Sequence, residues 1–482
     1  MQRSVLMQQN QIENTSDRKG KVILLSLIAA LGGFLFGYDS GVINGTVDAL
    51  QIAFDSDAVG TGFNVASMLL GCMIGSFFAG TLADKFGRKP VLLVTAAAFI
   101  ISAYGSGIAA SSSEFVTYRM LGGFAVGSAS IIAPAYIGEI SPARYRGALI
   151  SIQQLAIIVG LTSSFISNYT IASLAGGSTE ILWLGFGAWQ WMFWAEIIPA
   201  SIFLLALFFI PESPRYLVAA GKEHIAEKVL GSLYTKLDVK AKVNEIRETV
   251  SKERKSTLRD LVSSITGKLH PIVVSGIGIA ILQQFTGINV VLYYGSVLWQ
   301  SAGFTEADAL LTNVITGVVM VFGTILAIVI VDRVGRKPLL MIGGLGQAFM
   351  LAVMALVFGF AAEGDAGQLV LNPTEGRIAL LAAMGYVAFF SFTWGPIMWV
   401  MLGEMFPNRF RGAALAVCGL AQWGSNFLVT MTFPLLLSSI GLGFSYGIYA
   451  FFGIVAYYFV KYFIIETKGR TLEEMSLDYA EK

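Results

Sequence analysis

Residues 84–89 read DKFGRK, and residues 332–337 in the other half of the chain read DRVGRK. A second signature follows each of these: residues 139–147 read EISPARYRG, and residues 404–412 read EMFPNRFRG. If these were simply basic loops, they would need only Lys and Arg. They would not need the two signatures in the same order in both halves, with Glu, Arg and Gly at matching positions. The chain is therefore predicted to contain two copies of one structural unit.

Long apolar segments flank these signatures. The chain has 482 residues, of which 55% are hydrophobic and only 13% are charged, which is too little charge for a soluble surface. A helix that crosses a bilayer needs about 20 mostly apolar residues, and its backbone must satisfy its own hydrogen bonds there. Twelve segments meet this requirement, near 22–47, 62–83, 90–110, 115–137, 148–168, 189–210, 271–299, 309–331, 338–360, 378–402, 412–435 and 443–464.

The connections between these segments alternate between a basic set and an acidic set. The basic set holds Lys85, Arg88, Lys89, Arg144, Arg146, the segment 215–268, Arg333, Arg336, Lys337, Arg409, Arg411, Lys468 and Arg470. The other set lies at 48–61, 111–114, 169–188, 300–308, 361–377 and 436–442, where Arg377 is the only basic residue. Because Lys and Arg accumulate on the cytoplasmic side, the basic set and both termini are predicted to be cytoplasmic.

The predicted fold is an all-α membrane protein with twelve transmembrane helices in two six-helix halves. The halves are expected at 22–211 and 271–465, with a cytoplasmic N-terminal segment at 1–21 and a cytoplasmic tail at 466–482. The segment 212–270 is long and charged, with apolar residues at helical spacing, and is predicted to form cytoplasmic linker helices.

The charged residues of the signatures are predicted to form a cytoplasmic gate that pairs across the halves when the inner mouth is shut. A looser repeat, PESPR at 211–215 against ETKGR at 466–470, adds to this set. The candidate gate residues are Asp84, Arg88, Glu139, Arg146, Glu212, Arg215, Asp332, Arg336, Glu404, Arg411 and Glu466. Each exposed pair contributes only about 0–1 kcal/mol, but several together can bias two states.

Ionisable residues inside apolar segments are costly and usually functional. Asp39 lies in the first segment and Arg119 at the start of the fourth. If they face each other, they form a partly buried pair. Burial favours the protonated carboxyl and the guanidinium favours the ionised one, which suits a group that binds and releases a proton. A structural ion pair that does not titrate is the alternative.

Neutral amides and indoles also lie at membrane depth. Gln283, Gln284 and Asn289 share the seventh segment, where a break at Gly287 would let all three converge. Further candidates are Gln154 in the fifth segment, Gly395 and Trp399 in the tenth, and Gln422, Trp423 and Asn426 in the eleventh. Amides can donate to and accept from vicinal hydroxyls, and indole faces can cover the apolar face of a pyranose. Single amides can simply join helices, but the whole set favours a ligand site.

No metal centre or cofactor is expected. Cys72 and Cys418 lie in opposite halves, and His224 and His270 have no second nitrogen ligand at metal-binding spacing. No P-loop and no nucleophile–base arrangement is visible, so neither an ATP-driven pump nor an enzyme is predicted. A formal net charge of +1 gives no indication of a nucleic-acid partner.

These motifs resemble the sugar porter family of the major facilitator superfamily, especially the bacterial xylose– and hexose–proton symporters. The resemblance covers nearly the whole chain. It implies that sugar contacts Phe36, Gln154, Gln283, Gln284, Asn289, Tyr293, Trp399, Gln422 and Trp423. Asp39 stands where family symporters have Asp and facilitative transporters typically have Asn. Two positions depart from the family pattern, because Met320 and Leu161 stand where amides are common.

The expected activity is import of a monosaccharide with a proton by alternating access, in a cell membrane and as a monomer. A facilitative uniporter on the same fold, with Asp39 always ionised, is the first alternative. A transporter-like sugar sensor is a second, although only a short stretch follows the last apolar segment. The sugar itself is left open between hexoses and pentoses.

Overall fold

The computed structural model describes residues 19–142, 145–234, 238–252, 257–262, 267–363, 369–407 and 409–468. Most of the predicted segments 1–21 and 466–482 therefore lie outside the described residues, as do Arg144 and Arg470.

The described chain is almost entirely helical. The first half contains α2 (Lys19–Val42), η1 (Ile43–Gly45), α3 (Val47–Ala53), α4 (Ala58–Phe86), α5 (Arg88–Ile108), α6 (Ser112–Ile140), α7 (Arg146–Ala175), β1 (Ile181–Trp183), β2 (Phe186–Gly187), α8 (Ala188–Ala195) and α9 (Ile197–Phe208). The linker contains α10 (Pro214–Ala219), α11 (Glu223–Leu233), α12 (Val239–Lys252) and η2 (Leu258–Leu261). The second half contains α13 (Pro271–Phe285), α14 (Ile288–Ser301), α15 (Glu306–Val334), α16 (Arg336–Phe360), β3 (Ala362–Glu363), β4 (Leu369–Val370), α17 (Pro373–Phe392), α18 (Trp394–Met405) and α19 (Arg411–Phe463).

Eleven helical stretches of the described chain are long and apolar enough to cross a membrane. The last of these, α19, runs for 53 residues, but Gly441 interrupts it with a non-helical backbone (φ 75°, ψ 175°). Divided at Gly441, α19 supplies two spans, so the twelve predicted spans are confirmed.

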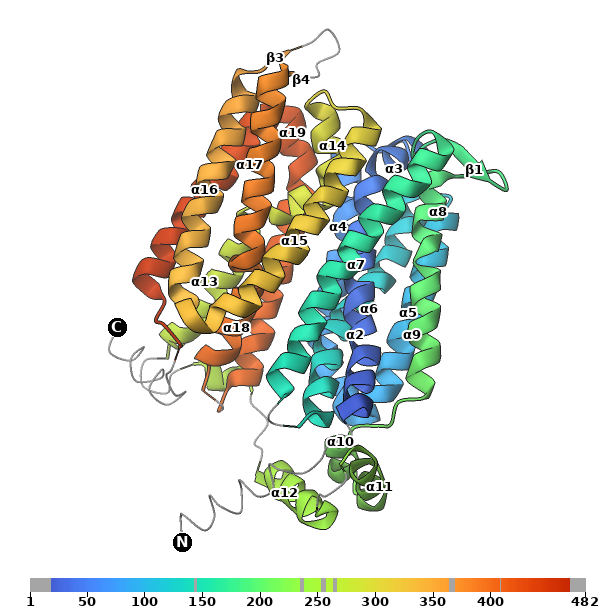
Figure 1. The fold of residues 1–482 in the computed structure, drawn as a ribbon, viewed down its shortest axis with the longest axis vertical. Coiled ribbons are helices and arrows are strands. Elements are labelled where there is room, and N and C mark those ends of the chain that lie inside the picture. The colour runs from blue at the N-terminus through green and yellow to red at the C-terminus, as the bar shows by residue number, and fades with distance from the viewer. Residues whose placement is uncertain are drawn as a thin grey trace.

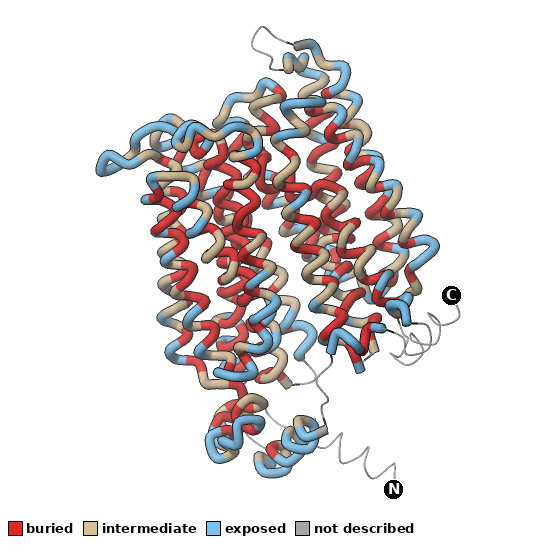
Figure 2. The backbone as a smooth tube through the Cα atoms, turned by 180° about the vertical axis from the view of Figure 1, so that it is seen from behind, coloured by how far each residue is buried: buried red, intermediate tan, exposed pale blue. Residues whose placement is uncertain are grey.

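The two halves stand side by side, as Figure 1 shows from blue to green and from yellow to red. The linker helices α10–α12 lie at one end, called here the inner end, and the hairpins β1–β2 and β3–β4 lie at the opposite, outer end (Figure 1). Buried residues follow the interior of each half, while the outward-facing surface is largely exposed (Figure 2). Many exposed side chains there are apolar, for example Phe322 and Ile202, as expected of surfaces that face lipid.

Small residues set how closely the helices approach. A Cβ atom added at Gly71 or Gly75 of α4 would lie 2.1 or 2.3 Å from backbone oxygens of α6, and one at Gly123 of α6 would lie 1.8 Å from the carbonyl oxygen of Met68 in α4. Close packing of backbones through small residues is the usual way in which helices associate in a bilayer. Lipid is as apolar as a helix surface, so burial of apolar side chains does not drive this association.

Candidate functional site

A central cavity lies between the two halves. All ten predicted substrate-binding residues line it: Phe36, Gln154, Gln283, Gln284, Asn289, Tyr293, Gly395, Trp399, Gln422 and Trp423. They come from α2 and α7 of the first half and from α13, α14, α18 and α19 of the second. Their contact with sugar remains a prediction, but the halves bring these side chains to one chamber.

The seventh span is broken at Gly287, as predicted. Gly287 has a left-handed backbone (φ 83°, ψ 17°), and α13 ends before it while α14 begins after it. The ring of Tyr449 would lie 2.7 Å from a Cβ atom at Gly287, so both the conformation and the space require glycine. The Tyr386 hydroxyl donates to the carbonyl oxygen of Thr286 at 2.9 Å and satisfies one backbone group that the break leaves open.

The break aligns the three amides of this span into a chain. Asn289 donates to the side-chain oxygen of Gln284, and Gln284 donates to that of Gln283 at 3.0 Å. Gln283 in turn donates to the carbonyl oxygen of Trp394 at 2.9 Å. All three side chains are buried. The amides are thus held in fixed orientations, which is what selective recognition of hydroxyl groups requires.

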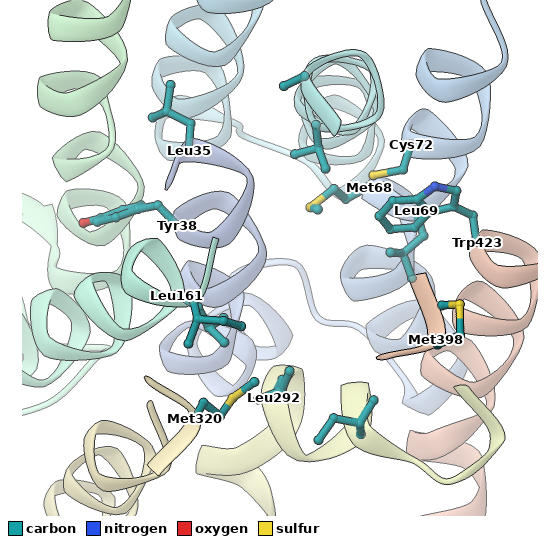
Figure 3. Close-up of a cluster of buried hydrophobic side chains, with 14 of the residues drawn as sticks. Leu35, Tyr38, Met68, Leu69, Cys72, Leu161, Leu292, Met320, Met398 and Trp423 are labelled. Atoms are coloured by element: carbon teal, nitrogen blue, oxygen red, sulfur yellow. The ribbon is translucent and has the colours of Figure 1, made fainter. Parts of the chain in front are cut away.

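One wall of the cavity is apolar. Leu161 of α7, Met320 of α15 and Leu292 of α14 lie next to one another in Figure 3, and all three line the cavity. Leu161 and Met320 are the two departures from the family pattern noted in the sequence. Across the cavity, the rings of Phe36 and Trp423 meet with centroids 5.8 Å apart, which joins the halves through an aromatic contact.

Asp39 of α2 and Arg119 of α6 face each other inside the first half. The Arg119 guanidinium donates to the Asp39 carboxylate and, at 3.1 Å, to the Asp39 carbonyl oxygen. Each side chain is only 1% exposed. The prediction of a partly buried pair was wrong in degree, because α4, α6 and α8 cover both groups completely: Met68 of α4 contacts the guanidinium and Phe193 of α8 lies against it.

A third ionisable group, Glu196, joins this pair and was missed in the sequence. It lies between α8 and α9, is 1% exposed, and interacts electrostatically with both Asp39 and Arg119. Apart from these interactions, neither carboxylate oxygen of Glu196 has a hydrogen-bond partner among the described residues. Glu196 is the only ionisable residue of the predicted span 189–210. The reasoning that singled out Asp39 would have found it.

The repeated signatures build matching ion-pair clusters at the inner end. In the first half, Arg88 pairs with Asp84 at 3.4 Å and with Glu139 at 2.9 Å. In the second half, Arg336 pairs with Asp332 at 2.9 Å and with Glu404 at 2.7 Å.

The third, looser repeat completes both clusters. Glu212 accepts hydrogen bonds from the backbone N–H groups of Arg88 and Lys89 at 3.0 and 3.1 Å. Glu466 accepts from those of Arg336 and Lys337 at 3.0 and 2.9 Å. The internal duplication read from the sequence therefore extends to individual hydrogen bonds.

These ion pairs brace each half and do not bridge the halves in this structure. Arg146 and Arg411 donate to carbonyl oxygens of their own halves, those of Ser141 at 3.5 Å and Phe406 at 3.1 Å. Arg215 lies in the first turn of α10. The five ion pairs that Arg88, Arg119 and Arg336 make with carboxylates each stay within one half.

Hydrogen bonds between the halves gather instead at the outer end. Asn44 donates to the Leu292 carbonyl oxygen at 2.7 Å and accepts from Asn313 at 2.6 Å. Gln300 donates to Asp48 at 2.6 Å, and the Ser178 N–H donates to Glu306 at 2.9 Å. Hydrogen bonds thus join the halves at the outer end, while the inner clusters stay within their own halves.

Comparisons with known proteins agree with this geometry. The chain is 49% identical to the glucose transport protein of Synechocystis sp. over 455 residues, which cover 94% of this chain and 97% of that protein. It is 39% identical to the D-xylose-proton symporter of Escherichia coli, covering 96% of each chain. The xylose transporter XylE of E. coli in a partially occluded inward-open conformation matches with a TM-score of 0.79 and 37% identity, covering 94% of this chain and 99% of XylE.

The family described as sugar (and other) transporter matches residues 25–479. Taken with the twelve spans, the duplicated clusters and relatives that align from end to end, this match shows that the chain is an integral membrane protein that belongs to the sugar (and other) transporter family.

Proposed function

We propose that this protein imports a monosaccharide together with a proton by alternating access. The observation that carries the proposal is that a neutral, amide-lined cavity and a buried carboxylate cluster share one turn of helix α2. Similarity to a glucose transport protein and to a D-xylose-proton symporter supports both parts. The protein would act as a monomer in the cell's inner membrane, with both termini in the cytoplasm.

The cavity suits an uncharged polyol. Its polar groups are mainly amides, which both donate and accept, and no Asp, Glu, Lys or Arg lines it within the described chain. A charged substrate would therefore find no counter-ion. The rings of Phe36 and Trp423 offer an apolar surface to the C–H face of a sugar.

The proton would bind at the Asp39–Glu196–Arg119 cluster. Two carboxyls facing one guanidinium leave one negative charge in excess when both are ionised, and burial makes that charge costly. One bound proton removes the excess. It would also weaken the hold of Arg119 on Asp39 and free α2 to shift against α6.

Helix α2 connects the two sites. Phe36, Gly37 and Ser40 line the sugar cavity, and Asp39 on the same turn bonds Arg119. A movement of this turn on protonation would therefore change the positions of the side chains that line the sugar cavity. The halves at 22–211 and 271–465, each braced by its own ion-pair cluster, would then rock as bodies about the cavity.

Uptake of a radiolabelled sugar panel into proteoliposomes tests the proposal. The wild type should concentrate its sugar only under an inward proton gradient. Asp39→Asn and Glu196→Gln should lose that accumulation while still exchanging sugar down its own gradient, because the cavity is unchanged. Glu180→Gln, which alters an exposed carboxyl of the same half, is the matched control and should keep accumulation. Accumulation by Asp39→Asn would refute proton coupling at this cluster.

Facilitated uniport on the same fold is the second candidate. The direct hydrogen bond from Arg119 to Asp39 favours it, because this bond stabilises an Asp39 that stays ionised. In that case the wild type would equilibrate sugar but never concentrate it, whatever the proton gradient.

A further inference from the structure

A short hairpin outside the membrane spans carries an exposed apolar surface. Strands β1 and β2 connect α7 to α8 and pair antiparallel, with Trp183 opposite Phe186. The hairpin projects sideways from the outer end of the first half, and the view from behind agrees (Figures 1 and 2). It is thus placed beside the bundle, over the region that lipid around the protein would occupy.

The exposed side chains of the hairpin are the kind that water disfavours. Ile181 is 70% exposed, Trp183 57% and Leu184 85%. Residues 181–187 contain no charged side chain. Scattered exposed apolar residues are normal, but a contiguous group on one projecting element indicates an interaction surface.

The residue at the tip also disagrees with the turn that it forms. Leu184 and Gly185 both have positive φ, 57° and 81°, as a two-residue hairpin turn requires. Asn or Gly is preferred at the first of these positions, because a branched apolar side chain is strained there. Neither the backbone nor contact with water accounts for leucine at this site. Contact of the Leu184 side chain with an apolar medium would account for it.

The hairpin is held in place by an aromatic cluster rather than projecting freely. The rings of Trp183 and Trp191 meet edge to face with centroids 5.5 Å apart, and those of Phe186 and Trp194 at 4.9 Å. Both indole N–H groups at the base donate to backbone oxygens, Trp191 to Trp183 at 3.3 Å and Trp194 to Tyr104 at 3.1 Å. Indoles that present an apolar face with a satisfied N–H are characteristic of the membrane–water interface.

We propose that the hairpin Ile181–Gly187 lies in the headgroup and upper acyl region of the leaflet at the outer end, with Leu184 and Trp183 inserted among the lipids. The absence of charge and the lateral position favour lipid over a soluble partner. The hairpin begins three residues after Ser178, whose N–H donates to Glu306 of the other half. The hairpin therefore anchors the outer edge of the first half to lipid. This edge contacts the second half, and the two must separate there when the outer end opens. The proposal concerns placement in the membrane and stands whether or not the carrier is proton-coupled.

A polarity-sensitive fluorophore on Leu184→Cys in proteoliposomes tests the placement. The native Cys72 and Cys418 are buried, which limits background labelling. Asn244→Cys on the exposed face of α12 is the aqueous reference, and Ile202→Cys on the lipid-facing side of α9 is the hydrocarbon reference. We expect emission shifted to the blue relative to Asn244→Cys. We also expect several-fold stronger quenching by a lipid spin label near the headgroup than by one at the chain end, with the reverse order at Ile202→Cys.

Two outcomes would overturn the proposal. Quenching of the Leu184 label by aqueous iodide as efficient as at Asn244→Cys would place the hairpin in water. Disulfide-linked dimers of unlabelled Leu184→Cys in the membrane would show that a second copy covers it. A second variant, Leu184→Asn, keeps the hairpin because asparagine fits the turn. If the hairpin lies in lipid, the substitution should not raise the unfolding temperature in lipid nanodiscs; a clear rise would mean that the tip is solvated.

Discussion

Removal of the Asn44 side-chain amide should open the outer end of the protein. Three hydrogen bonds between the halves depend on this amide: its Nδ2 donates to Leu292, and its Oδ1 accepts from Asn313 and, at 3.2 Å, from the Ser296 N–H. Asn44→Leu conserves the size of the side chain and removes all three. The partners are buried while the outer end is closed.

The size of the effect follows from those three bonds. A buried hydrogen bond contributes about 0.5–1.5 kcal/mol net, so their loss destabilises the closed outer end by about 2–4 kcal/mol. The open state escapes this cost because water hydrates the three partners once the halves separate. Since about 1.4 kcal/mol is a factor of ten, the equilibrium should shift roughly 30- to 700-fold toward an open outer end.

Spin labels across the outer end can measure this shift. Gln51→Cys in α3 and Ala307→Cys in α15 are exposed and belong to different halves. In Asn44→Leu the ratio of the long-distance to the short-distance population should rise by that factor. Asn168→Leu is the matched control, because Asn168 donates to the Val42 carbonyl oxygen at 3.0 Å within one half and should lower stability without moving the labels apart. An unchanged distance in Asn44→Leu, or the same change in both variants, would refute the reasoning.

Three further predictions concern the cavity, the helix break and the outer end. Met320→Asn places an unpaired amide in the apolar wall and should weaken the affinity for the preferred sugar about tenfold. Sugars with a hydroxyl on that side should then compete for uptake better, relative to the preferred sugar, than they do in the wild type. An unchanged ranking of sugars in competition uptake would contradict this. Gly287→Ala should lower the unfolding temperature more than Gly441→Ala, since both have positive φ but only Gly287 also faces a close ring, that of Tyr449; equal shifts in thermal unfolding would argue against that contact. Burial raises the pKa of Asp48, whose carboxyl becomes hydrated when the outer end opens. The closed state therefore binds a proton more tightly, and acidification toward the raised pKa should favour closure in the spin-label distances, whereas Asp48→Asn should remove this pH dependence.

The sequence alone was sufficient to predict the number of spans, the duplication and the break in the seventh helix. A spanning helix crosses the bilayer from one side to the other, so position along the sequence corresponds to depth in the membrane. Apolar runs and the Lys and Arg residues of the loops can therefore be read from the sequence directly. The break at Gly287 could be recognised because an unbroken helix would not place Asn289 on the same face as Gln283, whereas a break lets the amides converge. The amides and indoles of the cavity stood out because polar groups are expensive at that depth.

Pairing between side chains was decided by the tertiary structure. In this structure Arg88 binds Glu139 and Arg336 binds Glu404 within each half, and the pairing across the halves that was expected for a shut inner mouth stays a prediction. Glu196 meets Asp39 and Arg119 only because the sixth span turns its one carboxyl inward. Lipid and protein interior are equally apolar, so hydropathy gives the depth of a residue but not the direction in which it points. Direction around the helix axis, and with it every partner, depends on how the spans pack.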